Sequence, residues 1–282
     1  MNITNLPFPI SFTKMNGAGN DFIIIDHRKA WLAGEDQAEF ARLICRHKFS
    51  VGADGLILIE DDEQADFRWQ FYNADGSLAE MCGNGARCAA RYAHEHKISP
   101  AKMRFKTIAG IIEAEIQGRK VRIKMTSPVD LRLNELMEID GIERRLHHIN
   151  TGVPHVVCFV DNITTSQVQE WGRNIRFHPH YHPAGTNVNF VRQTADGLHI
   201  RTYERGVEDE TMACGTGAVA AALISGLMGA SSPATVITSG GDKLIIHFQI
   251  DKNQRIDNVY LEGGAAIVYE GLLNAEAMLT GR

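Results

Sequence analysis

The sequence predicts an α+β fold built from two homologous halves, each organised around a single helix. Three observations carry this prediction. The 282 residues, 44% of them apolar, are enough for two modest domains with separate cores. Segments with strand-like alternation outnumber helical segments and follow one another in runs. The same order of motifs also occurs twice along the chain, which is typical of a duplicated domain.

The repeat consists of three kinds of segment: an apolar strand that ends in Asp, a Gly turn that leads into an extended run, and a Cys-Gly-x-Gly motif that leads into an Ala-rich run. In chain order the matching pairs are 20–26 with 155–161, 52–60 with 185–193, and 82–90 with 214–222. The offsets between matched positions are 135, 133 and 132 residues. Because chance matches would scatter, these nearly constant offsets indicate homologous halves.

The secondary structure is predicted from periodicity and turn residues. Helices are expected at 36–48, 84–96, 164–174 and 215–227. Further strands are expected at 67–72, 103–116, 120–125, 198–204, 243–250 and 259–271. The boundary is placed near Ser127-Pro128, which gives an N-terminal half of 1–127 and a C-terminal half of 128–265. A closing strand at about 266–282 could return to the first half.

Composition and charge argue against several classes of protein. The 29 basic and 34 acidic residues give a net charge of -5, and no cluster of Lys and Arg marks a nucleic-acid surface. The first 14 residues lack the charged and apolar regions of a signal peptide. The most apolar segment, 217–230, is too short and too rich in Gly to span a bilayer. We therefore expect a cytoplasmic protein without nucleic-acid or membrane partners.

The five cysteines fall into two groups. An odd number of thiols in a long chain without export signals argues against a disulfide framework. Cys45, Cys88 and Cys158 lie among apolar neighbours or on an Ala-rich helix and are expected to be buried in the core. Cys82 and Cys214 instead precede the two Gly-x-Gly turns. These two thiols are the candidates for chemistry.

The position of Cys82 and Cys214 before a helix has chemical consequences. The glycines precede uninterrupted runs of helix formers, so each cysteine lies at or just outside a helix N-terminus. Unpaired amides and the helix dipole stabilise an anion there and lower a thiol pKa from its reference value of about 8.5. The glycines let a ligand approach the backbone, whose amides can hold a carboxylate or a phosphate.

Two such thiols related by a repeat suggest a narrower function. If the helix N-termini of the two halves face each other across a cleft, one thiolate could remove a proton from a carbon. The opposite thiol could then deliver a proton to the other face of that carbon. Two cysteines in matching surroundings supply an acid and a base of matched pKa. The amides would stabilise the enolate character of the adjacent carboxylate, and this chemistry requires no cofactor.

Residue types alone leave several roles open for these motifs. A single Cys-Gly-x-Gly-Ala could be a helix start packed on a sheet, although packing does not explain why the thiol recurs. Neither copy is a P-loop. A redox pair or a thiol nucleophile is the functional rival, without the close CxxC spacing. His178, His180 and His182 could share one face as metal ligands, but His in a Pro-broken loop is more often solvated, and no metal is expected.

Longer motifs along the whole chain are similar to those of the diaminopimelate epimerase family. In order they are MNGAGNDF, GADGLI, YNADGSLAEMCGNGAR, TGVPH, GTNVNF, YERGVEDETMACGTGA and GGAAIVYEG. The resemblance implies interconversion of LL- and meso-2,6-diaminopimelate without pyridoxal phosphate, in lysine and peptidoglycan precursor synthesis. It also implies two similar α/β domains, each a sheet wrapped around a central helix, that close over the substrate.

The resemblance assigns roles to residues that match the family's motifs. Cys82 and Cys214 match the catalytic pair, with Cys214 as the base and Cys82 as the acid in the LL-to-meso direction. His155, at the repeat position matched to Asn20, and Glu204 correspond to the polar pair that orients the reacting amino group and supports catalysis. Substrate contacts correspond to Asn20, Asn73, Asn187, Glu204 and Arg205, and the backbone that holds the reacting carboxylate to Gly83, Asn84, Gly215 and Thr216. A guanidinium such as Arg205 can hold the distal carboxylate with two parallel hydrogen bonds.

Two positions depart from the family's pattern. Gly55 stands where the family has a substrate-contacting Gln, and Val153 stands where it often has an Asn. Each change removes a polar contact, so water or a neighbouring side chain must replace it, and the two changes affect the details of distal-end recognition. Tyr269 matches a tyrosine at the family's dimer contact, so a homodimer is expected.

The nearest alternative is a racemase or epimerase for proline or hydroxyproline on the same two-thiol scaffold. The motifs YERG and YNADG argue against it, because a substrate with one carboxylate needs no distal clamp. A PhzF-like isomerase is more distant, since that relative works with a carboxylate instead of paired cysteines.

Overall fold

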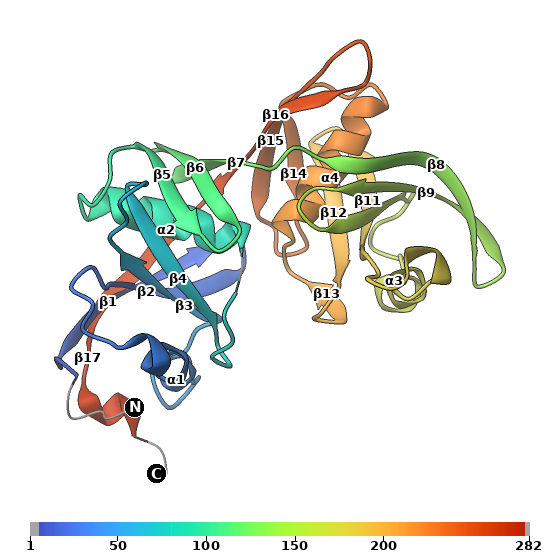
Figure 1. Cartoon of the computed structure of the whole chain (residues 1–282). Coiled ribbons are helices and arrows are strands. Elements are labelled where there is room, and N and C mark those ends of the chain that lie inside the picture. The colour runs from blue at the N-terminus through green and yellow to red at the C-terminus, as the bar shows by residue number, and fades with distance from the viewer. Residues whose placement is uncertain (1–5, 80, 280–282) are drawn as a thin grey trace. The chain divides into compact units, whose positions relative to one another are not determined.

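The computed structural model describes residues 6–79 and 81–279. The chain divides into two compact units. Unit 1 comprises residues 1–123 and 264–282, and unit 2 comprises residues 124–263. The last strand of the chain therefore belongs to the same unit as the first, and Figure 1 shows β17 alongside β1.

The described residues of unit 1 form two α-helices and eight strands. The helices are α1 (Gly34–Ile44) and α2 (Gly83–Glu95), and a short 3-10 helix, η3 (Ala275–Met278), follows the last strand. The strands are β1 (Ile10–Gly17), β2 (Asn20–Asp26), β3 (Gly55–Glu60), β4 (Phe67–Asn73), β5 (Lys102–Thr107), β6 (Gly110–Gln117), β7 (Lys120–Lys124) and β17 (Ala266–Leu273). They are hydrogen-bonded in the order β17-β1-β2-β3-β4-β5-β6-β7, and only β2–β3 and β4–β5 are parallel.

Unit 2 contains α3 (Val168–Arg176), α4 (Gly215–Leu227) and the 3-10 helix η2 (Pro179–Tyr181). Its strands are β8 (Val129–Ile139), β9 (Ile142–Asn150), β10 (Pro154–Phe159), β11 (Asn187–Thr194), β12 (Gly197–Glu204), β13 (Asp209–Thr211), β14 (Ala234–Ile237), β15 (Lys243–Ile250) and β16 (Ile256–Gly264). Their order is β8-β9-β10-β11-β12-β14-β15-β16, with β10–β11 and β12–β14 parallel. The short β13 pairs separately with β12.

The two units repeat one pattern of strand pairing. Reading across either unit, the first two neighbour pairs are antiparallel, the third is parallel, the fourth antiparallel, the fifth parallel and the last two antiparallel. In this pattern β17 of unit 1 corresponds to β8 of unit 2. The prediction of a two-part α+β fold with one central helix in each part is therefore confirmed.

Each unit wraps its strands around one central helix. Helix α2 contacts β1, β2, β3 and β6, and α4 contacts β9, β10, β11, β12, β14 and β15. Helix α1 packs on β3 and β4, and α3 packs on β11 and β12. Every residue of β3 is buried, as expected for a strand covered by a helix on both faces. Within the described ranges, no helix is long and apolar enough to cross a membrane.

The four predicted helices are present, α4 with the predicted ends and the other three with shifted ends, and two of the predicted strands were wrong in length. The expected strand at 103–116 breaks at Ile108 and Ala109, where a turn enters Gly110 with φ of 117°. The expected strand at 259–271 breaks at Ala265, between a strand of unit 2 and one of unit 1. The β8–β9 hairpin was not predicted, because many of its side chains are exposed and polar and give no apolar periodicity.

We predict that Leu58→Ala lowers the free energy of unfolding by about 2–5 kcal/mol, because Leu58 is fully buried in β3 and its loss leaves a cavity. Urea denaturation followed by fluorescence measures the change. The control is Ile108→Ala, at a turn residue that is 53% exposed, which should stay within about 0.5 kcal/mol of the original chain. Equal effects of the two substitutions would contradict the described core.

Candidate active site

Both candidate thiols lie at the start of a central helix. Cys82 is the N-cap residue of α2, with extended backbone angles, and its Sγ accepts a hydrogen bond from the Gly85 amide at 3.5 Å. Cys214 is the N-cap residue of α4, and its Sγ lies 3.5 Å from the Thr216 hydroxyl. The predicted position of both cysteines at helix N-termini is confirmed.

The other three thiols are buried and inert. Cys45, Cys88 and Cys158 are each at most 4% exposed, as predicted. Burial raises the pKa of Cys45 to about 12, of Cys88 to about 12 and of Cys158 to about 11, because a thiolate cannot be solvated there. They remain protonated near neutral pH, whereas Cys82 is half-buried and Cys214, although only 9% exposed, lies at a helix N-terminus.

A buried guanidinium supports the first turn of α2. Arg87 has no exposed surface and donates to the Gly83 carbonyl at 3.2 Å and to Asn84 Oδ1 at 2.7 Å. It also donates to the Gly264 carbonyl of the same unit at 3.3 Å. Arg87 therefore fixes the backbone and the side chain of two residues predicted to bind the reacting carboxylate. The corresponding position of α4 is Val219, so this support belongs to unit 1 alone.

The hydrogen bonds around Arg87 extend through Asn84 to Asn20, the first residue of β2. Asn84 Nδ2 donates to Asn20 Oδ1 at 2.8 Å, and Asn20 Nδ2 donates to Asp54 Oδ2 at 3.0 Å. Asp54 also accepts from the Asp21 amide at 3.1 Å. Two of the predicted substrate residues, Asn20 and Asn84, are thus brought together beside Cys82 by direct hydrogen bonds.

Gly55 lies directly across from Asn73 in the β3–β4 pair. A Cβ at Gly55 would lie 2.7 Å from the Phe71 ring and 2.7 Å from the Tyr72 carbonyl oxygen, so no larger side chain fits without displacing that ring. Water or a neighbouring side chain was expected to replace the missing polar contact, but the Phe71 ring occupies the space beside Gly55. Asn73 Nδ2 donates to Ser77 Oγ at 3.0 Å, and its side chain remains exposed at the strand end.

Unit 2 places three predicted residues in one row across the ends of β10, β11 and β12. His155 pairs in register with Asn187, and the Val188–Tyr203 pair puts Asn187 beside Glu204. Asn187 Nδ2 donates to the Pro154 carbonyl at 3.0 Å, and its Oδ1 accepts from the Arg205 amide at 2.9 Å. The row therefore ends at the turn that presents the Arg205 side chain.

Glu204 and Thr216 are each held by a threonine. Thr211 Oγ1 donates to Glu204 Oε2 at 2.8 Å, and burial raises the pKa of the Glu204 carboxyl above its usual range although this hydrogen bond lowers it. Thr151 Oγ1 donates to the Thr216 carbonyl at 3.0 Å, which fixes the first turn of α4 after Gly215.

The predicted match of His155 with Asn20 in the repeat was wrong by two residues. In unit 1, Phe22 pairs with Gly55, which pairs with Asn73. In unit 2, His155 pairs with Asn187, beside Glu204. His155 therefore corresponds to Phe22. Because side chains alternate along a strand, a shift of two residues keeps the same face of the sheet.

His155 is fully buried, and burial lowers its pKa to about 3, helped by the charges of His148 and Arg205. Its Nδ1 lies 3.1 Å from Asn189 Nδ2. Asn189 Oδ1 in turn accepts from the Thr202 hydroxyl at 3.0 Å. Neither Asn189 nor Thr202 was predicted as a site residue. The alternation in GTNVNF, which puts Asn187 and Asn189 on one face of the strand, is the signal that could have identified the first of them.

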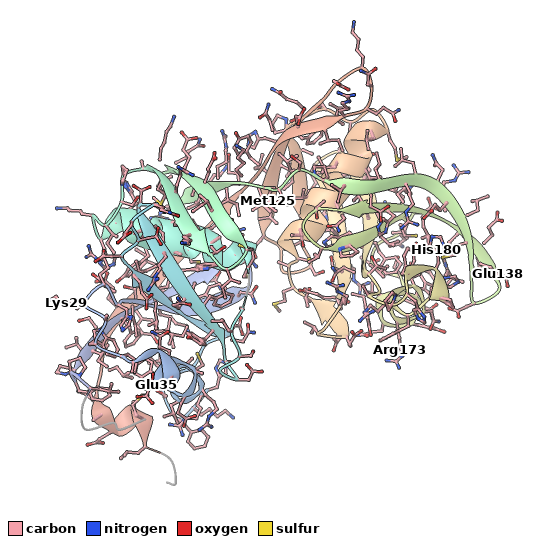
Figure 2. The ribbon with its side chains drawn as sticks, viewed as in Figure 1. Lys29, Glu35, Met125, Glu138, Arg173 and His180 are labelled. Carbon is pink, nitrogen blue, oxygen red and sulfur yellow. The ribbon has the colours of Figure 1, made fainter. Side chains whose placement is uncertain are left out.

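The three histidines of FHPHYHP do not converge. His178 Nδ1 accepts from the His180 amide at 3.2 Å, and His182 Nε2 lies 3.2 Å from the Phe177 carbonyl. Figure 2 labels His180 on unit 2, where its Nε2 lies 3.5 Å from Glu135 Oε1. Over residues 6–79 and 81–279, no group of three or more His, Cys, Asp or Glu side chains could hold a metal ion.

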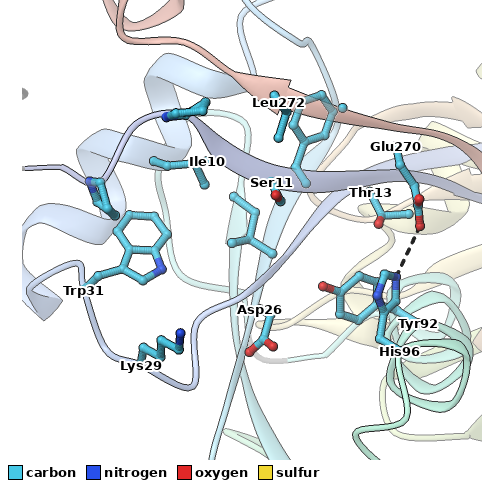
Figure 3. Close-up of a pocket in the computed structure, with 15 residues that line it drawn as sticks. Ile10, Ser11, Thr13, Asp26, Lys29, Trp31, Tyr92, His96, Glu270 and Leu272 are labelled. Atoms are coloured by element: carbon cyan, nitrogen blue, oxygen red, sulfur yellow. Dashed lines mark ion pairs between the residues drawn. The ribbon is translucent and has the colours of Figure 1, made fainter.

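A cavity of about 800 Å³ lies elsewhere in unit 1, beside the C-terminal end of α2. Figure 3 shows Trp31 and Lys29 on one side of it and the His96–Glu270 pair, 3.5 Å apart, on the other. None of the residues predicted from the sequence to bind substrate lines this cavity. Since Cys82 lies at the opposite end of the same helix, the cavity is separate from the candidate site.

The comparison with known families rests on both halves of the chain. The family model described as diaminopimelate epimerase matches residues 12–131 and 147–268. The chain belongs to the diaminopimelate epimerase family. Diaminopimelate epimerase of Aquifex aeolicus is 45% identical over 282 residues, covering 95% of this chain and 99% of the relative. The Hydrogenobaculum enzyme of the same name is 46% identical over 278 residues, covering 94% and 98%.

Solved structures share the fold of this epimerase-family chain. A PhzF-family phenazine biosynthesis protein of Bacillus anthracis matches with a TM-score of 0.71 and 16% identity, covering 94% of this chain and 98% of that one. A hydroxyproline epimerase of Agrobacterium vitis, with bound trans-4-OH-L-proline, matches with a TM-score of 0.66 and 13% identity, covering 95% and 93%. At these identities the likeness shows the fold alone.

We predict that brief treatment of the native epimerase-family protein with iodoacetamide at pH 8 labels Cys82 first and leaves Cys45, Cys88 and Cys158 unlabelled. Cys82 is half-buried, whereas a thiol of pKa about 11 has a thiolate fraction near 10⁻³ at this pH. Peptide mass spectrometry locates the label, and the unfolded chain should label at all five thiols. Labelling of Cys88 as fast as Cys82 in the native protein would contradict this assignment.

Proposed function

We propose that the chain interconverts LL- and meso-2,6-diaminopimelate without pyridoxal phosphate, by a two-base mechanism of Cys82 and Cys214. The observation that carries this proposal is that each of these thiols caps the central helix of a repeated unit, while the other three lie in the core and have raised pKa values. Membership of the diaminopimelate epimerase family supplies the substrate. The enzyme would serve lysine and peptidoglycan precursor synthesis.

In the LL-to-meso direction, we assign Cys214 as the base and Cys82 as the acid. The Cys214 thiolate takes the α-hydrogen as a proton, and the electron pair of the broken C–H bond remains on the substrate as an enolate-like carbanion. The Cys82 thiol then gives its proton to the opposite face of the same carbon, so a new C–H bond forms there. Cys214 ends as a thiol and Cys82 as a thiolate, and the reverse reaction exchanges the roles.

The first turns of α2 and α4 are proposed to hold the reacting carboxylate. Backbone amides at the N-terminus of each 13-residue helix favour negative charge, which grows on the carboxylate as the proton leaves. The residues that supply these amides are Gly83, Asn84, Gly215 and Thr216. The hydrogen bonds of Arg87 in unit 1 and of Thr151 in unit 2 keep these turns in place before substrate arrives.

The remaining contacts are proposed to fix the rest of the substrate. Arg205 would clamp the distal carboxylate, since its guanidinium can donate two parallel hydrogen bonds. Glu204 would hold an amino group, and Asn20, Asn73 and Asn187 would bind the polar ends of the molecule. Gly55 would contribute only backbone, because the Phe71 ring fills the space beside it.

The wider setting of the enzyme is also proposed. The five free cysteines support a cytoplasmic location, where thiols stay reduced. We propose units 1 and 2 as the two halves that close over substrate, with the predicted halves 1–127 plus 266–282 and 128–265 as their counterparts in sequence. A homodimer is proposed through β17, whose exposed large apolar side chains are Val268, Tyr269 and Leu272.

We predict that Cys82→Ala and Cys214→Ala each lower kcat/KM for LL-diaminopimelate by about 10⁴-fold or more, because each removes one of two obligatory proton carriers. A coupled assay of meso-diaminopimelate formation, without added pyridoxal phosphate, measures the loss. Cys158→Ala is the matched control, since that thiol is buried away from both helix starts, and it should retain activity.

Full activity in either variant would exclude the two-base assignment. No activity of the unaltered protein with diaminopimelate, together with turnover of proline or hydroxyproline, would favour the alternative epimerase. Peroxide reduction coupled to a Cys82–Cys214 disulfide, without epimerisation, would favour the redox alternative.

We predict that Tyr269→Asp weakens dimerisation by about 10-fold or more, because it places a charge in an apolar contact. Sedimentation velocity at several protein concentrations measures the dissociation constant. The matched control is Val129→Asp, because Val129 is a 59% exposed apolar residue on β8, which corresponds to β17 in unit 2. A monomer in the unaltered protein, or equal weakening by both substitutions, would contradict the proposed contact.

A further inference from the structure

A buried polar network in unit 2 lies beside the first turn of α4. It consists of His155 on β10, Asn189 on β11 and Thr202 on β12, of which none is more than 2% exposed. A Cβ at Gly217 would lie 2.3 Å from Asn189 Oδ1 and 3.3 Å from the Cβ of Cys214. The network is therefore in close contact with the helix turn that carries the Cys214 thiol.

Unit 1 has apolar side chains at the corresponding positions. By strand register, Phe22, Ile57 and Phe71 take the places of the three polar residues. A Cβ at Gly85 would lie 3.4 Å from Ile57 and 3.5 Å from Phe22, which are ordinary contact distances, so the first turn of α2 also packs directly on these strands. The shared backbone therefore does not require polar groups at this level. Burying three of them in unit 2 costs free energy that the fold alone does not explain.

The hydrogen bonds fix the orientation of the Asn189 amide. Its Nδ2 donates to the Val156 carbonyl oxygen at 2.9 Å, and a carbonyl can only accept, so this atom must be the nitrogen. The other amide atom, Oδ1, accepts from the Thr202 hydroxyl. The second hydrogen of Nδ2 then remains for His155 Nδ1, 3.1 Å away.

This orientation determines the protonation of His155. Because Nδ1 accepts from Asn189, it carries no proton, and the imidazole must be the neutral form with its proton on Nε2. Burial favours the same neutral form. Three charged or titratable groups are near the ring or in its row: His148 on β9, Arg205 after β12, and Glu204 at the end of β12. Cys214 is the titratable group at the start of the adjoining helix α4.

The Nε2–H group of His155 is a buried donor that has no hydrogen-bond partner among the described residues. An unsatisfied buried donor is costly, and this one belongs to the network beside the first turn of α4, where a bound group would satisfy it. An N–H donor suits a carboxylate oxygen and cannot accept from an ammonium group. The family's assignment of His155 to the reacting amino group therefore does not fit this tautomer, whereas the Glu204 carboxylate does fit an ammonium group.

We propose that Asn189 and Thr202 are positioning residues that hold His155 as a fixed, neutral hydrogen-bond donor, and that its Nε2–H binds a carboxylate oxygen of the substrate. This inference rests on the proposed epimerase function. The donor would strengthen its hydrogen bond as charge moves onto the carboxylate in the transition state. His155 would then stabilise charge and would exchange no proton with the substrate.

The test is a long-range ¹H–¹⁵N NMR spectrum of the full chain with ¹⁵N-labelled histidine, with the His155 signals assigned by their loss in His155→Gln. We expect an unprotonated Nδ1 and a protonated Nε2 that stay unchanged from pH 6 to pH 9. Addition of meso-diaminopimelate should shift the Nε2 signal and leave the tautomer unchanged. A protonated Nδ1, a titration within this pH range, or an Nε2 signal that ignores meso-diaminopimelate would each overturn the proposal.

Two near-isosteric substitutions test the positioning role. Asn189→Asp replaces the donor to Nδ1 with an acceptor, so His155 should take a proton on Nδ1 and kcat should fall by about 10²-fold with a smaller change in KM. Thr202→Val removes the hydroxyl that fixes the Asn189 amide, so it should alter the His155 spectrum and lower the activity. Thr202→Ser keeps a hydroxyl and should preserve both. Failure of Asn189→Asp to change the tautomer would overturn the inference.

A structural control separates packing from positioning. Ile57 is the residue of unit 1 that corresponds to Asn189 of unit 2. Ile57→Val shortens this buried side chain, so it should lower the melting temperature without altering the His155 signals. A change of the His155 tautomer in Ile57→Val would overturn the positioning role. The spectrum of the substrate-free protein does not depend on activity. If the chain fails to epimerise diaminopimelate but shows the expected tautomer, the proposed function is refuted and the control of the His155 tautomer by Asn189 still holds.

Discussion

The position of each candidate thiol depends on how a central helix packs on the strands beneath its first turn. In α4 this packing requires a glycine, because a Cβ at Gly217 would lie 2.3 Å from Asn189 Oδ1, whereas a Cβ at Gly85 of α2 would meet Ile57 and Phe22 at ordinary contact distances of 3.4 and 3.5 Å. In each helix the cysteine three residues before this glycine is the N-cap, where unpaired amides are available to an anion. The strand order, the helix start and the N-cap thiol therefore occur together in both unit 1 and unit 2.

The duplicated backbone carries different chemistry in its two copies. In unit 1 the helix start is supported by a buried cation, Arg87, and lies on apolar side chains. In unit 2 it lies on a neutral network of three polar side chains, with Val219 at the position of Arg87. In the proposed reaction, proton transfer at either face uses a similar thiol, but the rest of the substrate differs from one side of the carbon to the other. We attribute the polar differences between the copies to this asymmetry.

Much of the architecture was predictable because the same motifs occur in the same order in both halves of the sequence. The Gly-x-Gly runs identified both helix starts, and apolar neighbours identified the inert thiols, since burial is a local property of sequence pattern. The alternation in GTNVNF could have placed Asn189 on the same face as Asn187, but its role was not predictable, because its partners on the neighbouring strands were unknown. The same holds for Arg87, whose contact with Gly264 joins residues far apart in sequence. The break at Ala265 was missed because the strands on either side are both apolar and belong to different units.

The central claim is that two different groups handle the proton on opposite faces of one carbon. The most direct measurement is the deuterium content of the α-carbon in both isomers when LL-diaminopimelate reacts in heavy water and is stopped at low conversion. Two separate proton carriers predict that the meso product contains solvent deuterium while the recovered LL isomer retains its original hydrogen. A product that keeps the substrate's hydrogen, or equal deuterium in both isomers from the start, would contradict the account.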